Sequence, residues 1–410
     1  MARRLLLIIP FLLLLVEGFR YAFREGDFAG YAIAGEYALK GMDLYSHWLN
    51  TWPPLFSVFC IPIYWINEIA PFPLRVIWQL LSVAAFFHLS GRLIFMFQGK
   101  RLVYRVEKND FELSAFSWYF ILPFLLVFKY ILDNLANLQI NILMLALLVE
   151  AVYLFKHKQN VTWSAFLLAL TLCLKVYTVF FFILFVFIRE WKLFFITLSW
   201  MVILHIPMLT VFGWEQSFIY FQRWWVEIAQ AFPMIGHKNQ SFFAAVWRLT
   251  VNQDAGLEIA THIVNLSLEQ SKRLVYILVL LIGSFPLWRI IQQPKVNFNL
   301  LFALFVGVIP LLSPLAWKAY FIFLTPAFFY LSHQWLDGNM LNRDKVLFVI
   351  ASVFLTFSSD IFLGQYGSDL AELFSLITLG GVLIISILII NVLEISKHIK
   401  SDEESIGNRK

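Results

Sequence analysis

The sequence predicts an all-α protein that crosses a membrane many times. Of its 410 residues, 60% are hydrophobic and 14% are charged, whereas an ordinary soluble domain is about 45–50% apolar. The mean hydropathy is +0.76. The hydrophobic residues are also grouped into long runs that end at charged residues or at proline and glycine. These three observations exclude a soluble globule and predict a bundle of about twelve transmembrane helices.

The apolar runs give the expected helices in chain order, and the positive-inside rule orients them, because Lys and Arg in short loops stay on the cytoplasmic side. The runs occupy residues 4–23, 55–70, 74–97, 113–132, 138–155, 162–174, 176–188, 193–212, 273–291, 299–312, 315–333, 346–363 and 371–393. Arg3 and Arg4 place the start of the chain inside. The first helix then crosses outward, and both termini are expected in the cytoplasm.

Two stretches are not expected to form ordinary crossings. Run 55–70 is interrupted by Pro62 and closed by Pro71, which favours a helix that lies in the membrane interface. The runs on either side of Lys175 are expected to be two short helices, since one continuous helix would place the cationic loop that follows it on the outer side.

We expect one transmembrane domain over residues 1–396, followed by a charged cytoplasmic tail over 397–410. Its outer face carries a first loop, 24–72, and a long loop, 213–271. The amino-terminal segment resembles a signal peptide. An uncleaved anchor is the preferred interpretation, because cleavage would remove Asp27 from the first outer loop.

Charge and cysteine usage exclude several classes of function. The 31 Lys and Arg residues exceed the 26 Asp and Glu residues by only +5 and are scattered over short loops, so nucleic acid is not an expected partner. Cys60 and Cys173 lie far apart in apolar sequence, without the spacing of a zinc or redox site. No Asp-x-Asp pair is present to hold a divalent ion, so neither a metal nor another cofactor is expected.

Polar residues gather on the predicted outer side. Asp27 follows the first apolar run, where an acid is costly unless it is paired or used. A carboxylate among cations at a membrane face suits transfer of a group from a phosphate carrier, with the acid as general base and the cations on the phosphate. A transporter would instead place its polar groups near the bilayer midplane. The other candidates on this side are Asp43, Tyr45, Gln139, Asn141, Lys175, His237, Lys238, Asn239, Gln240, Arg248 and Lys318.

These candidates also have purely structural interpretations. Asp27 could cap the helix that follows it. Gly41 and Asp43 could end that helix and form a turn, and this structural role is the preferred one for Asp43. The segment Trp52-Pro53-Pro54 could break the chain before run 55–70. The cations could each extend toward phospholipid headgroups.

Taken together, these residues resemble the polytopic GT-C glycosyltransferases, in particular glycosyltransferase family 87, whose bacterial members are mannosyltransferases of the polyprenyl-phosphate-mannose type. At residues 138–141 this chain has Leu where the family more often has Gly before Gln. The motifs that carry the resemblance, in order, are Gly26-Asp27-Phe28, Gly41-Met42-Asp43-Leu44-Tyr45, Trp52-Pro53-Pro54-Leu55, Leu138-Gln139-Ile140-Asn141, Lys175-Val176-Tyr177, Asn239-Gln240-Ser241 with Arg248, and Ser313-Pro314 with Trp317.

The resemblance implies an inverting hexosyltransferase, with mannose as the expected sugar, in a bacterial inner membrane with its active site on the extracytoplasmic face. Asp27 would be the general base. A glycolipid or cell-envelope glycan would be the acceptor, and the chain is expected to act as a monomer surrounded by membrane lipids. The residues expected on the phosphate of a polyprenyl-phosphate sugar donor are Lys175, Lys238, Arg248, His237 and Lys318. Those expected to bind substrate or to shape loops are Asp43, Tyr45, Gln139, Asn141, Asn239 and Gln240.

The competing hypothesis is a transporter or flippase of lipid-linked sugars. Such a protein would lose little function on Asp27→Asn if this residue is only a helix cap. A transferase would lose nearly all turnover with the same change, since a missing base lowers the rate by at least ~100-fold.

Overall fold

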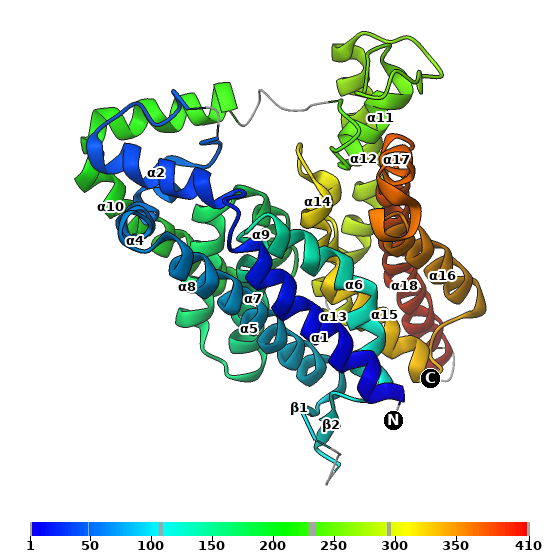
Figure 1. Cartoon of the computed structure of the whole chain (residues 1–410). Helices are drawn as coiled ribbons and strands as arrows, with labels where there is room; N and C mark the ends of the chain where they lie inside the picture. The colour runs from blue at the N-terminus through cyan, green and yellow to red at the C-terminus, as the bar shows by residue number, and fades with distance from the viewer. Residues whose placement is uncertain (1, 48, 106–109, 229–234, 293–296, 408–410) are drawn as a thin grey trace. The chain divides into compact units, whose positions relative to one another are not determined.

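Helices dominate the structure of this protein (Figure 1). The computed structural model describes residues 2–47, 49–105, 110–228, 235–292 and 297–407. In this part of the chain the only strands are β1 (Arg101–Val103) and β2 (Glu112–Ser114), which form a short parallel pair. The predicted all-α class is therefore confirmed. The chain divides into two compact units, each of which is described by itself.

Unit 1 consists of Met1–Phe124, Phe128–Phe182 and Trp191–Phe232. Helix α7 packs between α5 and α8, and α2 packs on α3 and α4 (Figure 1). Besides the two strands, the elements of this unit are α1 (Ala2–Tyr21), α2 (Phe28–Lys40), α3 (Pro54–Phe59), α4 (Ile61–Ile69), α5 (Pro71–Gln98), most of α6 (Trp118–Ala136), α7 (Asn141–His157), α8 (Val161–Leu174), η1 (Val176–Thr178), the first part of α9 (Val179–Phe187), α10 (Trp191–Arg223) and η2 (Trp224–Ile228).

Unit 2 consists of Leu125–Val127, Ile183–Glu190 and Pro233–Lys410. Helix α18 packs against α13, α16 and α17, and α11 packs on α12. The predicted charged tail begins within α18, and residues 408–410 of that tail lie outside the described residues. The elements of this unit are the end of α9, α11 (Phe242–Thr250), α12 (Leu268–Gln292), α13 (Phe298–Gly307), α14 (Ile309–Leu312), η3 (Lys318–Leu324), α15 (Thr325–Leu336), α16 (Asn342–Phe357), α17 (Asp360–Leu373) and α18 (Leu376–Gly407).

Several of these helices are suited to cross a bilayer. By length and composition, five helices among the described residues are long and apolar enough, and a sixth span results if α16 and α17, which meet at 90°, are counted as one broken span. The five are α5, α6, α10 continued to Val226, α12 over Leu268–Ile291 and α18 over Leu376–Glu394. This set of helices indicates a membrane protein.

The predicted number of crossings, about twelve, is not confirmed by these five or six spans. Several of the predicted runs form shorter apolar helices of 10–17 residues, namely Pro54–Ile69, Val161–Leu174, Val176–Phe187 and Phe298–Leu312. At 1.5 Å per residue such helices reach about 15–25 Å, which is less than the ~30 Å of a bilayer hydrocarbon core. An apolar run therefore does not by itself establish a full crossing.

The predicted helix breaks are present. Run 55–70 forms α3 and α4, and α3 begins at Pro54, because the fixed φ of proline suits the first helical turn. The chain also breaks at Lys175, which has an extended backbone between α8 and η1. One boundary differs from the prediction: α10 continues past Gly213 to Arg223, although the apolar run ends just before this glycine. Gly213 turns the chain there with a φ of 73°.

Helix α2 lies unusually close to the segments that follow it. A Cβ at Gly35 would lie 2.2 Å from the carbonyl oxygen of Cys60, and one at Gly30 would lie 2.7 Å from the ring of Trp52. The ring of Trp52 also packs on that of Tyr31, with centroids 4.9 Å apart. Small residues of α2, such as Gly30, thus allow Trp52 to pack closely against this helix and against the ring of Tyr31.

Candidate active site

Asp27 is held by backbone contacts to the loop that precedes α7. Its N–H group donates to the carbonyl oxygen of Asn137 over 2.9 Å. Gly26 makes this close approach possible, because it has a φ of +49° and a Cβ at this position would lie 2.7 Å from the same oxygen. The segment before α2 is therefore fixed to the loop that precedes α7 at the position of the acid.

The side chain of Asp27 does not cap α2. Asp27 occupies the N-cap position with helical backbone angles, φ −67° and ψ −14°, and its carboxylate makes no capping hydrogen bond to this described helix. Instead, the carboxylate is hydrogen-bonded to the side chain of Gln139. The acid therefore points toward a polar group from a distant part of the chain.

A chain of hydrogen bonds connects Asp27 with Lys175. Gln139 bonds to the Asp27 carboxylate and accepts a hydrogen bond from the Asn141 amide. The Lys175 ammonium in turn donates to Asn141 Oδ1 over 2.7 Å. Gln139, Asn141 and Lys175 are all buried. Hydrogen bonds in such a site are electrostatically stronger than in water, so the four side chains hold one another in place. We call these four residues the Asp27 network.

The backbone of residues 138–141 supports this arrangement. Leu138 has a φ of 50°, in the left-handed region that favours glycine, and its side chain is fully buried. The indole N–H of Trp78 donates to the Leu138 carbonyl oxygen over 3.1 Å, and the Ile140 N–H donates to the Tyr31 hydroxyl over 3.2 Å. Leucine thus adopts the conformation that glycine would adopt easily. The strain, about 1–2 kcal/mol, is offset by burial of its side chain.

Burial and charge shift the two ionisable ends of the Asp27 network in opposite directions. Burial raises the pKa of the Asp27 carboxyl, against the opposing effects of the nearby Lys175 ammonium and the hydrogen bond from Gln139. Burial lowers the pKa of Lys175 to about 7, although the Asp27 carboxylate acts to raise it. The pKa values of both groups therefore lie closer to neutral pH than those of exposed Asp and Lys side chains, which is a property of acid–base sites.

Asp43 and Tyr45 shape the loop between α2 and α3. Asp43 Oδ1 accepts a hydrogen bond from the Tyr45 N–H at 3.2 Å and pairs with Arg223 at 2.7 Å. The Tyr45 hydroxyl donates to the carbonyl oxygen of Trp52 over 3.0 Å. These contacts attach the loop to the end of α10 and fit the structural role preferred for Asp43. The local sequence around Arg223 contains no sign of this distant partner.

In unit 2, Asn239 and Gln240 bind backbone groups. Asn239 donates to the Pro314 carbonyl oxygen and accepts from the Ala316 N–H, each over 3.0 Å. The Gln240 side chain donates to the carbonyl oxygen of Glu372 over 2.8 Å. Both amides thus shape the loop that precedes α11, which is one of the two roles expected for them.

Arg248 is almost completely buried, with 1% of its surface exposed. Its guanidinium donates to the carbonyl oxygens of Gly236 and Asn239 at 3.0 and 2.7 Å, and to Ser375 Oγ at 2.7 Å. Burial lowers the pKa of Arg248 to about 10. The structure brings this predicted phosphate ligand onto the backbone of the loop that contains Lys238, where it acts as an anchor.

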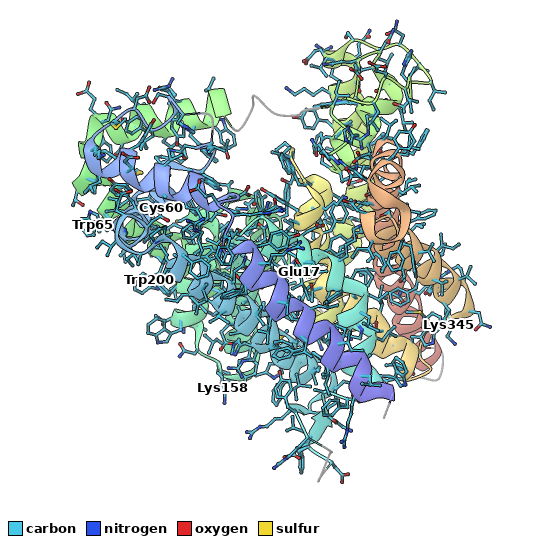
Figure 2. All side chains as sticks on the ribbon, in the orientation of Figure 1. Glu17, Cys60, Trp65, Lys158, Trp200 and Lys345 are labelled. Atoms are coloured by element: carbon cyan, nitrogen blue, oxygen red, sulfur yellow. The ribbon has the colours of Figure 1, made fainter. Side chains whose placement is uncertain are left out.

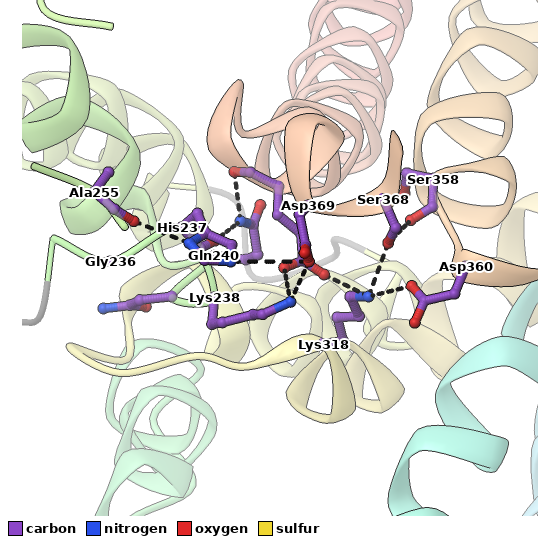
Figure 3. Close-up of polar contacts among 12 residues, drawn as sticks. Gly236, His237, Lys238, Gln240, Ala255, Lys318, Ser358, Asp360, Ser368 and Asp369 are labelled. Atoms are coloured by element: carbon purple, nitrogen blue, oxygen red, sulfur yellow. Dashed lines mark hydrogen bonds and ion pairs between the residues drawn. The ribbon is translucent and has the colours of Figure 1, made fainter. Parts of the chain in front are cut away.

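Lys238 and Lys318 converge on acidic residues of α17 (Figure 3). The fully buried Glu372 pairs with both lysines, at 3.2 Å from Lys238 and more closely with Lys318. Asp369 pairs with Lys238, and Asp360 lies 3.2 Å from Lys318. These acids were not predicted as site residues, because they show no motif spacing. Two of them, Asp360 and Glu372, lie within predicted apolar runs, where an acid is costly unless it is paired, and that was the available signal.

The chain also carries the sequence pattern of a known enzyme family. The pattern of glycosyltransferase family 87 matches residues 50–314, more than half of the 410 residues. The chain belongs to glycosyltransferase family 87. No curated protein and no solved structure gives a match to it. The predicted resemblance is confirmed, and the family identifies this membrane protein as a glycosyltransferase.

The family 87 match covers most of the predicted site but not its acid. Asp27, Asp43, Tyr45 and Lys318 lie outside residues 50–314. The predicted residues inside the match are Gln139, Asn141, Lys175, His237, Lys238, Asn239, Gln240 and Arg248. The Asp27 network therefore joins an acid outside the matched segment to three side chains within it.

His237 belongs to a group that could hold a metal ion in this family 87 protein. Among the described residues, ligand atoms of His237, Asp369 and Glu372 lie within 4.8 Å of one another. His237 Nδ1 bonds to a backbone carbonyl oxygen at 2.9 Å, and its Nε2 faces Asp369 at 3.8 Å, an arrangement also found in metal sites. However, two lysines already pair with these carboxylates, and a divalent ion would have to displace both. Metal-free activity stays a prediction.

Proposed function

We propose that this family 87 protein is an inverting hexosyltransferase that takes its sugar, mannose in the first instance, from a polyprenyl-phosphate carrier. The acceptor is a glycolipid or a cell-envelope glycan on the extracytoplasmic face of a bacterial inner membrane. Family membership supports the transferase class. The observation that carries the mechanism is the Asp27 network, which joins a half-buried acid to a buried cation.

In the proposed reaction, Asp27 is the general base. Its carboxylate accepts the proton of an acceptor hydroxyl while that oxygen attacks the anomeric carbon of the donor sugar. The bond between this carbon and the phosphate oxygen breaks, and its electron pair leaves with the polyprenyl phosphate. Because the attack comes from the face opposite the leaving group, the anomeric configuration inverts. Asp27 ends the step protonated.

The surroundings of Asp27 support this role. Burial raises the pKa of the carboxyl, which makes the carboxylate a stronger base than an exposed aspartate. The hydrogen bond from Gln139 fixes its orientation. The hydrogen bond from the Asp27 N–H to the Asn137 carbonyl oxygen fixes the acid near the start of α7.

We assign the donor phosphate to Lys175, the cation that the Asp27 network connects to the base. A phosphate beside this ammonium would favour its charged form and raise its pKa from about 7. The charge would then stabilise the phosphate as the leaving group departs. Phosphate contacts by the unit 2 cations stay predictions, since the structure shows these cations paired with acids or backbone.

The decisive experiment is Asp27→Asn in purified protein supplied with a radiolabelled polyprenyl-phosphate hexose and membrane lipid. Asn is nearly isosteric but cannot accept the proton. We expect kcat to fall at least ~100-fold while the donor still binds, because the base acts only during the transfer step. Product formation and donor binding are measured on the same preparation.

Asp43→Asn is the matched control, because it makes the same change in the same outer loop at a residue that pairs with Arg223. We expect it to retain turnover within about tenfold. The proposal is wrong if Asp27→Asn keeps more than a tenth of the wild-type rate. Movement of lipid-linked sugar across proteoliposomes without a transfer product would support the flippase hypothesis instead.

A further inference from the structure

A cavity of about 690 Å³ lies in unit 1 among α5, β1 and the end of α7. Its size falls within the range of about 300–1,000 Å³ that is typical of small-molecule sites. Cations and aromatic rings both line it, including Arg92, Arg101, Lys158, Phe95 and Tyr153. None of these residues belongs to the Asp27 network, so the cavity is a separate feature of the molecule.

The cavity and the Asp27 network lie at opposite ends of α7. This helix begins at Asn141, in the network, and is followed directly by Lys158, at the cavity. Its 17 residues span about 25 Å at 1.5 Å per residue. Figure 2 likewise shows Lys158 at the end of unit 1 away from Cys60, which contacts α2. Helix α5 is long and apolar enough to cross a bilayer, and it carries Phe95 of the cavity wall close to its last residue, Gln98. We therefore place the cavity at a membrane boundary, at the level of lipid headgroups.

The side chain of Arg92 is fixed at the wall of this cavity by contacts with two residues of α7. Two of its nitrogens bond to the Glu150 carboxylate, at 2.7 and 3.1 Å, and its guanidinium carbon lies 3.8 Å from the centroid of the Tyr153 ring. Its remaining Nη1 has no hydrogen-bond partner among the described residues. A guanidinium fixed on two sides loses little conformational entropy when it binds an anion.

Two further cations face the cavity without an acidic partner. Arg101 and Lys158 are exposed, and neither forms an ion pair with any residue that the structure describes. Together with Arg92 they outnumber the nearby Glu150, so the cavity carries an excess of positive charge. The rings of Phe95 and Tyr153 form apolar surface beside these cations.

We propose that this cavity binds the headgroup of an anionic phospholipid. The phosphate would contact Arg92, Arg101 and Lys158, and the glycerol and the upper acyl chains would lie along the rings and α5. A soluble phosphate compound would use the cations but not the adjoining apolar surface. Basic pockets between helices at a membrane boundary are suited to anionic lipids for these reasons. The site lies apart from the proposed transfer chemistry and does not depend on it.

The test measures lipid binding to the full chain by native mass spectrometry, with phosphatidylglycerol and phosphatidylcholine of identical acyl chains as probes. We expect the wild-type protein to retain phosphatidylglycerol in preference, and the double variant Arg101→Glu/Lys158→Glu to bind it about 10-fold or more weakly. The matched control is Arg189→Glu/Lys192→Glu, which reverses the same two residue types at exposed positions outside the cavity. It should bind as the wild type does.

A second variant tests the cavity without changing its charge. A Cβ at Gly91, on the cavity wall, meets nothing closer than Leu102 Cβ at 3.9 Å, so a side chain can begin here without a clash, and we expect the ring of Gly91→Phe to occupy part of the cavity. It should also lose phosphatidylglycerol. The proposal is overturned if wild type shows no preference between the two lipids, if the control loses as much binding as the double variant, or if Gly91→Phe binds normally. Equal binding of free glycerol phosphate would exclude the lipid as the specific ligand.

Discussion

At the scale of single residues, Asp27 and Lys175 depend on each other. The half-buried Asp27 carboxylate would be costly without a counter-ion, and so would the buried Lys175 ammonium. The hydrogen bonds through Gln139 and Asn141 join the two groups without direct contact being required. A direct ion pair with Lys175 would stabilise the ionised carboxylate and make it a weaker base. The connection through two amide side chains therefore leaves the Asp27 carboxylate able to accept a proton.

The opposite pKa shifts predict a bell-shaped dependence of kcat/KM on pH. The raised pKa of Asp27 keeps the base protonated at low pH, so the rate should rise as pH increases and the carboxyl ionises. Lys175, with a pKa of about 7, loses its charge as pH rises further, and the rate should fall. Lys175→Arg should move the alkaline limb upward by more than about one pH unit, since Arg stays protonated. A wild-type rate that stays constant from pH 7 to 9 would contradict this assignment.

At the scale of elements, the site depends on loops that approach one another closely. Gly26 lets the segment before α2 reach Asn137, and the left-handed backbone of Leu138 turns the chain into α7. In unit 2, Arg248 holds the loop before α11 by binding its carbonyl oxygens. Each loop is therefore positioned by a single residue, which permits a close backbone approach, adopts a left-handed conformation or binds backbone carbonyl oxygens.

Gly26→Ala should displace Asp27 without unfolding the protein. The added Cβ would lie 2.7 Å from the Asn137 carbonyl oxygen, so one of the two loops must move. A shift of about 1 Å in a reacting group can lower a rate ~100-fold, and we expect kcat to fall at least tenfold in the same transfer assay. Gly41→Ala is the control, because its φ of +65° imposes similar strain with nothing within 4 Å. Equal activity of the two variants would show that the contact with Asn137 is unimportant.

Arg248→Lys should lower stability more than it changes donor affinity. A single ammonium cannot reach the Gly236 and Asn239 carbonyl oxygens and Ser375 together, and buried carbonyls left unpaired cost about 1–3 kcal/mol each. We expect Tm to fall by about 5 °C or more, measured by thermal unfolding in detergent. Arg273→Lys, at a side chain that is 75% exposed, should leave Tm unchanged. A large increase in donor KM at unchanged Tm would instead favour a phosphate-binding role for Arg248.

At the scale of the whole molecule, we predict that apolar helices keep the proposed site at one membrane boundary. In unit 1, α7 begins at the Asp27 network and ends among cations. The positive-inside rule assigns those cations to the cytoplasm and therefore the acid to the outer face. This predicted orientation would give the proposed site access to a donor whose lipid chain stays in the bilayer.

Accessibility labelling tests that orientation within unit 1. Met42 and Lys158 are both exposed, so a cysteine at either position can react. The background replaces the two native cysteines, Cys60 and Cys173, which are buried. We expect a membrane-impermeant maleimide to label Met42→Cys in intact cells, and Lys158→Cys only after the membrane is opened. Labelling of both positions in intact cells would refute the predicted topology.

Local patterns in the sequence predicted much of the fold. The α-helical class, the break at Lys175 and the start of α3 at Pro54 follow from hydrophobicity and from the fixed φ of proline, which act over a few residues. The number of crossings could not be obtained in this way, because several runs form helices too short to span alone. Whether such a helix crosses depends on what covers its ends.

By itself, the sequence determined that this is a helical membrane protein of glycosyltransferase family 87, with polar candidates such as Asp27 and Lys175 beside its apolar runs. Only the tertiary structure decided which of these candidates meet. It joined Asp27 to Gln139, placed Arg248 on backbone carbonyls, and revealed the cavity at the far end of α7. The physical reason is that helix formation depends on neighbours in the chain, whereas hydrogen bonds between distant side chains depend on how the finished helices pack.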